Sequence, residues 1–137
     1  IPPAVWHEVV IEGGGRPGVA DVRGAREAGW IQIREPEDMR LLQILKSELD
    51  IGEAEAITLT VETHADLLLL DESEGRRIAE IYHLPKTGVI GILIRAKLEG
   101  RIKSLRRELD ALRQEGRFWI ADTLYFKALD AVGEKVR

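Results

Sequence analysis

Carboxylates are the residues of this chain best suited to chemistry, and they gather between Asp50 and Arg76. Glu53 and Glu55 lie in an acidic Gly-Glu-Ala-Glu-Ala-Ile segment, and an apolar run further on ends at Asp71. The carboxyl end of a buried parallel strand is where α/β sheets bind their ligands. Carboxylate oxygens suit a hard divalent cation, Mg²⁺ or Mn²⁺, and such a cation suits phosphate chemistry. The first hypothesis is therefore metal-dependent phosphate chemistry.

Each of these acids also has an ordinary structural interpretation. Asp71 can cap the helix expected after it, and this role is compatible with a site. Glu53 and Glu55 fall in the first turns of a helix, where the helix dipole favours acids without any function. Glu8, near Trp6, is either a surface residue or a third ligand. Three carboxylates from separate elements, completed by water, would satisfy Mg²⁺ or Mn²⁺.

Basic residues are concentrated in a different part of the chain. Residues 1–75 carry sixteen acids and six bases, whereas residues 76–117 carry eleven bases and five acids. An acidic part could hold metal while a basic part holds a phosphate backbone, although solvated helix faces explain the basic part equally well. The aromatic residues are few and are not interleaved with bases, which argues against a base-stacking platform. The basic candidates for phosphate binding are Arg76, Lys97, Arg101 and Lys103.

The elements that position these residues alternate between helices and short strands. Helical patterns are expected at residues 4–10, 19–29, 41–49, 53–62, 75–83, 92–98 and 102–114. A last helix, with Asp122 or Thr123 as its cap, is expected to end near Gly133. Ile78, Ala79 and Tyr82 are expected to point inward. Strands are expected at residues 30–33 and 67–70, and the wholly apolar run at 67–70 is typical of a buried parallel strand. A short strand and turn are expected at residues 87–91, and a short extended piece at 118–120. This alternation predicts an α/β fold with a parallel sheet covered on both faces.

Length and composition exclude several classes of protein. A chain of 137 residues is one domain by size, and its lack of cysteine excludes disulfides and fits a cytoplasmic location. No apolar run approaches the roughly 20 residues that span a bilayer, so no membrane partner is expected. The three histidines have no metal-ligand spacing, and neither a phosphate-binding loop nor a nucleophile elbow is present.

Several motifs, taken in order, resemble a known family. They are Ile1-Pro2-Pro3-Ala4-Val5-Trp6-x-Glu8-Val9, Leu49-Asp50-x-Gly52-Glu53-Ala54-Glu55-Ala56-Ile57, Leu68-Leu69-Leu70-Asp71-Glu72-x-x-Gly75-Arg76, Thr87-Gly88-x-x-Gly91 and Ala96-Lys97-x-x-Gly100-x-Ile102. Together they resemble the PIN-like family of prokaryotic proteins of unknown function, described as predicted nucleic-acid-binding proteins related to VapC-type toxins. The resemblance runs from Ile1 to about Glu134.

The resemblance implies a three-layer α/β/α sandwich around a central parallel sheet, in a single domain of residues 1–137. It implies a toxin-type endoribonuclease that holds Mg²⁺ or Mn²⁺ and cuts single-stranded RNA by metal-activated water, with an antitoxin and a second copy as possible partners. By position, Glu8, Glu53 and Asp71 match the acidic places of the family, and Glu55 is the alternative to Glu53.

One departure from the family concerns the start of the chain. The family begins with a central strand that carries Asp or Asn, and nothing in this sequence matches it. The chain opens on Ile1-Pro2-Pro3, so we expect the sequence to be N-terminally incomplete or another segment to fill that place. The alternative function is a non-catalytic binding or assembly module that keeps the fold and has lost nuclease activity.

Overall fold

The computed structural model describes residues 1–135 and divides the chain into two compact units, Ile1–Lys86 and Thr87–Arg137. We call these the first unit and the second unit. The expected single domain of residues 1–137 extends over residues 136 and 137, which lie outside the described part. No helix of the described residues is long and apolar enough to cross a lipid bilayer.

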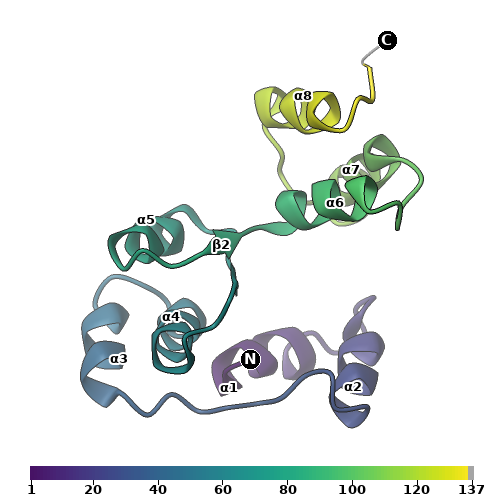
Figure 1. Ribbon diagram of the computed structural model, residues 1–137. Coiled ribbons are helices and arrows are strands. Elements are labelled where there is room, and N and C mark those ends of the chain that lie inside the picture. Colours follow the sequence, from purple (N-terminus) through teal and green to yellow (C-terminus); the bar gives the residue numbers. More distant parts are fainter. Residues whose placement is uncertain (136–137) are drawn as a thin grey trace. The chain divides into compact units, whose positions relative to one another are not determined.

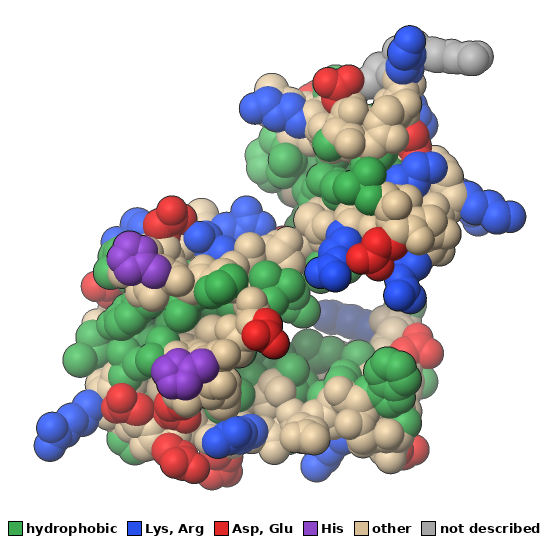
Figure 2. Space-filling view, in the orientation of Figure 1, with side chains coloured by type: hydrophobic (Ala, Val, Ile, Leu, Met, Phe, Trp, Pro, Cys, Tyr) green, Lys and Arg blue, Asp and Glu red, His purple; other side chains and the backbone are tan. Residues whose placement is uncertain are grey.

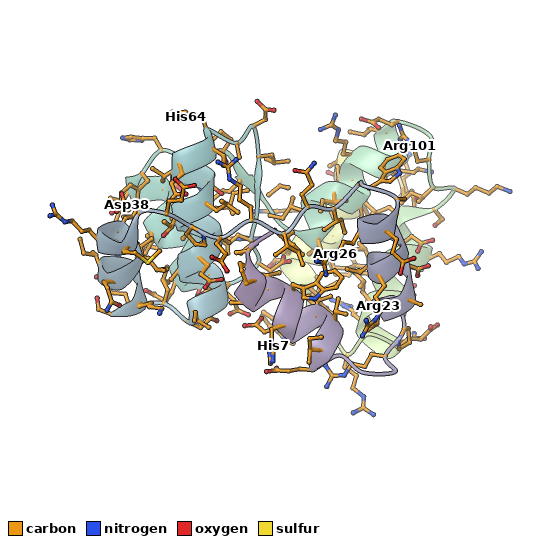
Figure 3. All side chains as sticks on the ribbon, turned by 90° about the horizontal axis from the view of Figure 1, so that it is seen from below. His7, Arg23, Arg26, Asp38, His64 and Arg101 are labelled. Atoms are coloured by element: carbon orange, nitrogen blue, oxygen red, sulfur yellow. The ribbon has the colours of Figure 1, made fainter. Side chains whose placement is uncertain are left out.

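In the first unit, helices surround one central helix, α4 (Figure 1). Helix α4 contacts α1, α3, α5 and strand β1, so it forms the axis of the unit. The elements in chain order, up to the boundary between the units, are α1 (Pro3–Trp6), the π-helix η1 (His7–Ile11), α2 (Val19–Glu27), α3 (Met39–Lys46), α4 (Ile51–Thr63), β1 (Leu68–Leu69), α5 (Ser73–Ile81) and β2 (Lys86–Thr87). Figure 3 marks the two ends of the α3–α4 pair, with Asp38 at the start of α3 and His64 at the end of α4.

The core of the first unit is built from the apolar faces of α3, α4 and α5 and from strand β1. Ala54, Ile57 and Ala79 are completely buried. The polar side chain of Thr58 is also buried, and its hydroxyl donates a hydrogen bond to the carbonyl oxygen of Ala54, 2.8 Å away. Burial of a hydroxyl is tolerated because this bond satisfies it.

Strands β1 and β2 form a small parallel sheet, joined through α5. The amide of Leu68 donates to the carbonyl oxygen of Pro85 at 2.8 Å. The expectation of a buried strand at residues 67–70 is correct for the strand and for only half of its side chains. Leu68 and Leu70 are buried, but Leu67 and Leu69 are exposed, because successive side chains of an extended segment point to opposite sides.

The predicted strand at residues 30–33 is also wrong. The segment is not part of the sheet, and its backbone bonds to the first residue of the chain instead. The amino group of Ile1 donates to the carbonyl oxygen of Gln32 at 2.7 Å, and the amide of Arg34 donates to the carbonyl oxygen of Ile1 at 3.0 Å. An alternating pattern predicts an extended backbone but does not supply a neighbouring strand.

The second unit is a bundle of three helices, α6 (Val89–Leu98), α7 (Leu105–Gln114) and α8 (Asp122–Ala131). Its core is completely buried at Leu105, Leu109 and Leu129. The short strand and turn expected at residues 87–91 are correct only at the start, since Thr87 belongs to β2 but α6 begins at Val89 after the cap residue Gly88.

Two smaller expectations also fail. The side chain of Tyr82 is exposed rather than inward, because Tyr82 lies just past the end of α5. Neither Asp122 nor Thr123 caps α8, because Ala121 is the cap residue and Asp122 instead pairs with Arg113.

Candidate functional site

The carboxylate of Glu53 is the most unusual polar group of the first unit. Asp50 caps α4, and its Oδ1 accepts a hydrogen bond from the amide of Glu53 at 2.8 Å. This arrangement begins the helix at Ile51 and places Glu53 in its first turn. Among the described residues, Glu53 Oε1 is the one buried side-chain oxygen or nitrogen with no hydrogen-bond partner. Because buried polar atoms are normally paired, this unpaired oxygen marks Glu53 as a candidate ligand-binding residue.

Two glycines make room for the carboxylates of Glu53 and Glu8. A Cβ atom at Gly75, in the first turn of α5, would lie 2.9 Å from Glu53 Oε1 and 3.0 Å from a methyl group of Leu70. A Cβ atom at Gly52 would lie 3.0 Å from Glu8 Oε1. Both glycines are buried, so the two carboxylates lie directly against backbone. Steric crowding therefore explains why glycine stands at positions 52 and 75 in the sequence motifs.

Like charges reinforce one another around Glu53. Burial, followed by the negative charges of Asp50, Glu72 and Glu8, raises the pKa of Glu53, and a backbone hydrogen bond from Asp50 partly opposes this. The pKa of Glu8 is also raised, first by burial of its carboxylate and then by Asp50 and Glu12, while His7 works in the opposite direction. The site is thus electronegative and uncompensated, which is the condition under which a cation binds. We use the name acidic pocket for this group of interacting charges, Glu8, Asp50, Glu53 and Glu72.

Asp71 lies at the end of β1, as expected from the sequence, but its carboxylate is engaged. Arg76 Nη2 lies 3.6 Å from Asp71 Oδ1, and Arg76 Nε donates to the carbonyl oxygen of Leu70 at 3.1 Å. The neighbouring Glu72, rather than Asp71, is the residue of this turn whose charge raises the pKa of Glu53. Arg76 thereby ties the turn after β1 to the first turns of α5.

The structure distinguishes Glu55 from Glu53. Glu55 Oε2 accepts a hydrogen bond from the amide of Ala4 at 2.9 Å, so this carboxylate satisfies the otherwise unpaired start of α1. Glu53 has no such structural partner for Oε1. The two acids of the Glu-Ala-Glu segment therefore face different neighbours, and Glu53 is the one whose surroundings suit a ligand.

A pocket of about 680 Å³ opens beside Glu8, and one of its lining residues is an arginine that was not among the residues predicted from the sequence. It is lined by Glu8, Glu12 and Arg16, together with Val9, Gly13, Pro17, Gly18, Val19 and Val22. Within residues 1–135 the Arg16 side chain forms no hydrogen bond or ion pair. A guanidinium without a protein partner, in one pocket with a carboxylate, is suited to an anionic ligand. The signal in the sequence was an arginine inside the glycine-rich loop that follows the Glu8 helix.

The π-helix η1 places Glu8 and this loop. The amide of Glu12 donates to the carbonyl oxygen of His7 at 2.9 Å, five residues back, instead of the usual four. Gly13 ends the segment, and no other residue fits there, because a Cβ atom would lie 2.0 Å from the carbonyl oxygen of Val9. In Figure 3, His7 is labelled on η1, and Arg23 and Arg26 on α2. The guanidinium of Arg26 stacks on the ring of Trp6 at 4.6 Å.

The predicted basic residues of the second unit are partly committed to internal contacts. Lys97 Nζ donates to the carbonyl oxygen of Lys103 at 2.6 Å and lies 3.2 Å from Glu134 Oε1. Arg101 pairs with Glu99 at 3.0 Å. On the face drawn in Figure 2, Arg and Lys side chains are spread around the second unit, while acidic side chains gather on the first unit near α3. The second unit therefore keeps exposed cations even though Lys97 is internal.

The donor set of the acidic pocket matches a hard divalent cation in chemistry. It consists of carboxylate oxygens, one of them buried and unpaired. In the described part of the chain, however, no three Asp, Glu or His side chains lie close enough together to form a complete metal site. Glu53 and Glu8 are the two predicted ligands that the structure brings into one electrostatic environment. These residues therefore suit a cation whose remaining ligands would be water or substrate oxygens.

Fold and site together define a class, an α/β protein with an acidic pocket in its first unit. Residues 1–134 match the model of the family DUF3368, which is described as a PIN domain, and the chain belongs to that family. This confirms the resemblance seen in the sequence motifs. Searches of curated proteins and of solved structures each return no match. Membership in a PIN-domain family indicates a nuclease-type function on nucleic acid.

Proposed function

We propose that this protein is a divalent-metal-dependent endoribonuclease of toxin type. The observation that carries the proposal is the buried, unpaired Glu53 Oε1, which lies among acids whose charges raise the pKa of Glu53. A charged group of this kind destabilises the folded chain unless a proton or a cation neutralises it, so its presence in the first turn of α4 favours a functional role. PIN-domain membership supports a nucleic acid as the substrate, and within that class we propose RNA.

Glu53 and Glu8 would hold the cation, and Asp71 is proposed as the third acidic residue. When bound, Mg²⁺ or Mn²⁺ supplies the charge that activates water and neutralises a phosphate oxygen. The cap at Asp50 fixes the backbone of Glu53, and the absence of a side chain at Gly75 leaves space for the Glu53 carboxylate. Arg76 holds Asp71 at the turn, and Arg16 offers a guanidinium to the phosphate group beside Glu8.

Further parts of the proposal concern the whole domain and its partners. The two units would belong to one PIN-like domain of the three-layer α/β/α type. Arg101 and Lys103, with their exposed side chains, would contact the RNA backbone. A toxin-type nuclease would act in the cytoplasm, be restrained by an antitoxin and form a homodimer. Co-expression with a neighbouring antitoxin gene, followed by co-purification, tests the partner directly.

The experiment that tests the activity combines RNA cleavage with metal binding. The full chain is incubated with single-stranded RNA and Mn²⁺, alongside Glu53→Gln, Glu8→Gln and Asp71→Ala. We expect cleavage by the wild type and a loss of at least about tenfold in each variant, as for loss of one metal ligand or its support. Mn²⁺ should raise the melting temperature of the wild type but not that of Glu53→Gln.

Asp66→Asn is the matched control, since Asp66 is an exposed acid of the first unit outside the acidic pocket. It should retain wild-type cleavage and the wild-type response to Mn²⁺. Equal cleavage by the wild type and Glu53→Gln would eliminate Glu53 as a ligand. Equal cleavage by the wild type and Asp71→Ala would remove Asp71 from the site.

The second candidate is a binding module without nuclease activity. It is favoured by the pairing of Asp71 with Arg76 and by the lack of a complete three-acid group within residues 1–135. This candidate predicts that the protein binds RNA, that it cleaves none with Mg²⁺ or Mn²⁺, and that Glu53→Gln leaves RNA affinity unchanged.

A further inference from the structure

The segment Phe118-Trp119-Ile120 of the second unit exposes one large aromatic ring on a fixed backbone. Trp119 is 83% exposed, whereas Ile120 is 5% exposed and Phe118 packs against the core of the three helices. Side chains of an extended segment alternate in direction, so the two inward residues force Trp119 outward. The exposure of Trp119 therefore follows from the packing on either side of it.

Hydrogen bonds hold this segment in place. The amide of Phe118 donates to the carbonyl oxygen of Leu112 at 2.9 Å, at the end of α7. Arg113 Nη2 donates to the carbonyl oxygen of Ile120 at 2.7 Å and to Asp122 Oδ1 at 2.9 Å. The same guanidinium lies over the ring of Tyr125 at 4.3 Å. These hydrogen bonds therefore fix the backbone segment to which the indole of Trp119 is attached.

A cation without a partner lies next to the ring. Arg117 has a positive φ of 51°, a conformation rare for residues other than glycine, and its side chain forms no hydrogen bond or ion pair among the described residues. Arg117 and Trp119 both line a pocket of about 470 Å³, together with Arg113, Phe118, Ile120 and Asp122. An exposed ring beside an unpaired guanidinium combines a stacking surface with a phosphate contact.

We propose that Trp119 and Arg117 form a binding site for single-stranded RNA, in which one base stacks on the indole and the adjacent phosphate contacts the guanidinium. The inference rests on the proposed RNA substrate, but it is independent of the acidic pocket and of any metal. The sequence as a whole predicts no base-stacking platform, because its aromatic and basic side chains are not interleaved. Within residues 113–119, however, Arg113, Arg117 and Trp119 line one pocket. Single strands are favoured over duplexes, because paired bases do not expose a face for stacking.

The test measures RNA binding by fluorescence anisotropy in EDTA, which separates binding from metal-dependent cleavage. A labelled single-stranded oligoribonucleotide is titrated with the wild type, Trp119→Ala, Trp119→Phe and Arg117→Ala. We expect Trp119→Ala to weaken binding by about 5- to 100-fold and Trp119→Phe to keep most of the affinity. Arg117→Ala should reduce the salt dependence of binding by about one counterion.

Matched controls exist in the first unit. Trp30 is 87% exposed, and Trp30→Ala should bind RNA like the wild type, as should Arg23→Ala, which removes an exposed arginine. Far-UV circular dichroism should show wild-type helix content in every variant, since all four side chains are exposed. Quenching of tryptophan emission by RNA should persist in Trp30→Phe and be lost in Trp119→Phe.

Three outcomes would overturn the proposal. The first is wild-type affinity in Trp119→Ala. The second is equal binding of the duplex form of the same oligonucleotide. The third is a change in oligomeric state in Trp119→Ala with unchanged RNA affinity, which would identify this surface as a protein interface. Failure of the acidic pocket to bind Mn²⁺ would leave these binding results unaffected.

Discussion

Gly75 provides the space that the carboxylate of Glu53 occupies: a Cβ atom built on Gly75 would lie 2.9 Å from Glu53 Oε1. The two residues belong to different helices, α5 and α4, so this contact sets how closely the two helix starts approach. Leu70 adds a second constraint, with methyl groups at 3.0 Å and 3.1 Å from the same position. The acidic pocket therefore depends on glycine at position 75 as much as on the acidic side chains themselves.

Substituting Gly75→Ala should destabilise the protein and disturb the acidic pocket. The added methyl group overpacks a buried position and should cost about 1–3 kcal/mol in the free energy of unfolding. Gly24→Ala is the control, because Gly24 lies in α2 and a Cβ atom there would have no neighbouring atom within 4 Å, so it should stabilise the helix by about 0.5–1 kcal/mol. Urea denaturation measures both values, and equal stability of Gly75→Ala and wild type would contradict the steric argument.

Glu53→Gln should increase stability in EDTA at neutral pH. The raised pKa means that the folded state holds its proton more tightly than the unfolded state. Stability from this group is thus present below the unfolded pKa and declines as pH rises toward the folded pKa. Gln removes that decline, so the stability gain over wild type should be larger at pH 7 than at pH 4 in urea denaturation. A variant less stable than wild type at pH 7 would show that the charge is compensated.

Glu55→Ala should have the opposite effect. It leaves the amide of Ala4 without its acceptor and should destabilise the chain by about 1–3 kcal/mol. Glu55→Gln retains an acceptor and should recover most of this loss. Calorimetric titration with Mn²⁺ should give wild-type affinity for Glu55→Gln. Reduced Mn²⁺ affinity in Glu55→Gln, with wild-type affinity in Glu53→Gln, would exchange the roles of the two acids.

Glu134 should make the second unit sensitive to acid. Burial acts to raise the pKa of Glu134, but backbone hydrogen bonds from Arg106 and Leu105 and side-chain bonds from Lys97 and Ser104 lower it to about 2. Since the folded pKa lies below the ordinary value of 4.5, the stabilisation is present above about pH 4.5 and is lost as pH falls toward 2.

Glu134→Gln should therefore cost about 2 kcal/mol at pH 7 and little at pH 2. The measurement is urea denaturation followed by circular dichroism at both pH values. Glu115→Gln, at an exposed acid of the same unit, should change stability at neither pH. An equal loss at both pH values would show that the charge of Glu134 contributes nothing.

The sequence predicted the helices well because their signals are local. The helix expected at residues 53–62 is α4, although it begins two residues earlier behind the cap at Asp50, and the last helix ends just before the left-handed Gly133, near its expected end. Strands were harder, since the segment at residues 30–33 has the right alternation but pairs with Ile1 instead of joining the sheet. Whether an extended segment joins a sheet depends on partners remote in sequence.

That the acidic residues form a metal site stays a prediction, and only part of their spatial grouping was visible in the sequence. Glu53 and Glu8 were expected to converge, and both contribute to one electronegative pocket. The pairing of Asp71 with Arg76 and the use of Glu55 at Ala4 were not visible in the spacing, because both require knowing which side chains meet in space. Arg16 was missed for the same reason.

Helix α4 combines two tasks that many proteins assign to separate elements. Its first turn carries Glu53, while the next residue, Ala54, and Ile57 are completely buried in the core. The backbone amides of such a helix exchange with deuterium only when the surrounding unit opens. A cation bound at Glu53 would therefore slow deuterium exchange along the whole of α4 and its neighbours α1, α3 and α5. Cation binding would then be thermodynamically coupled to the folding of the first unit.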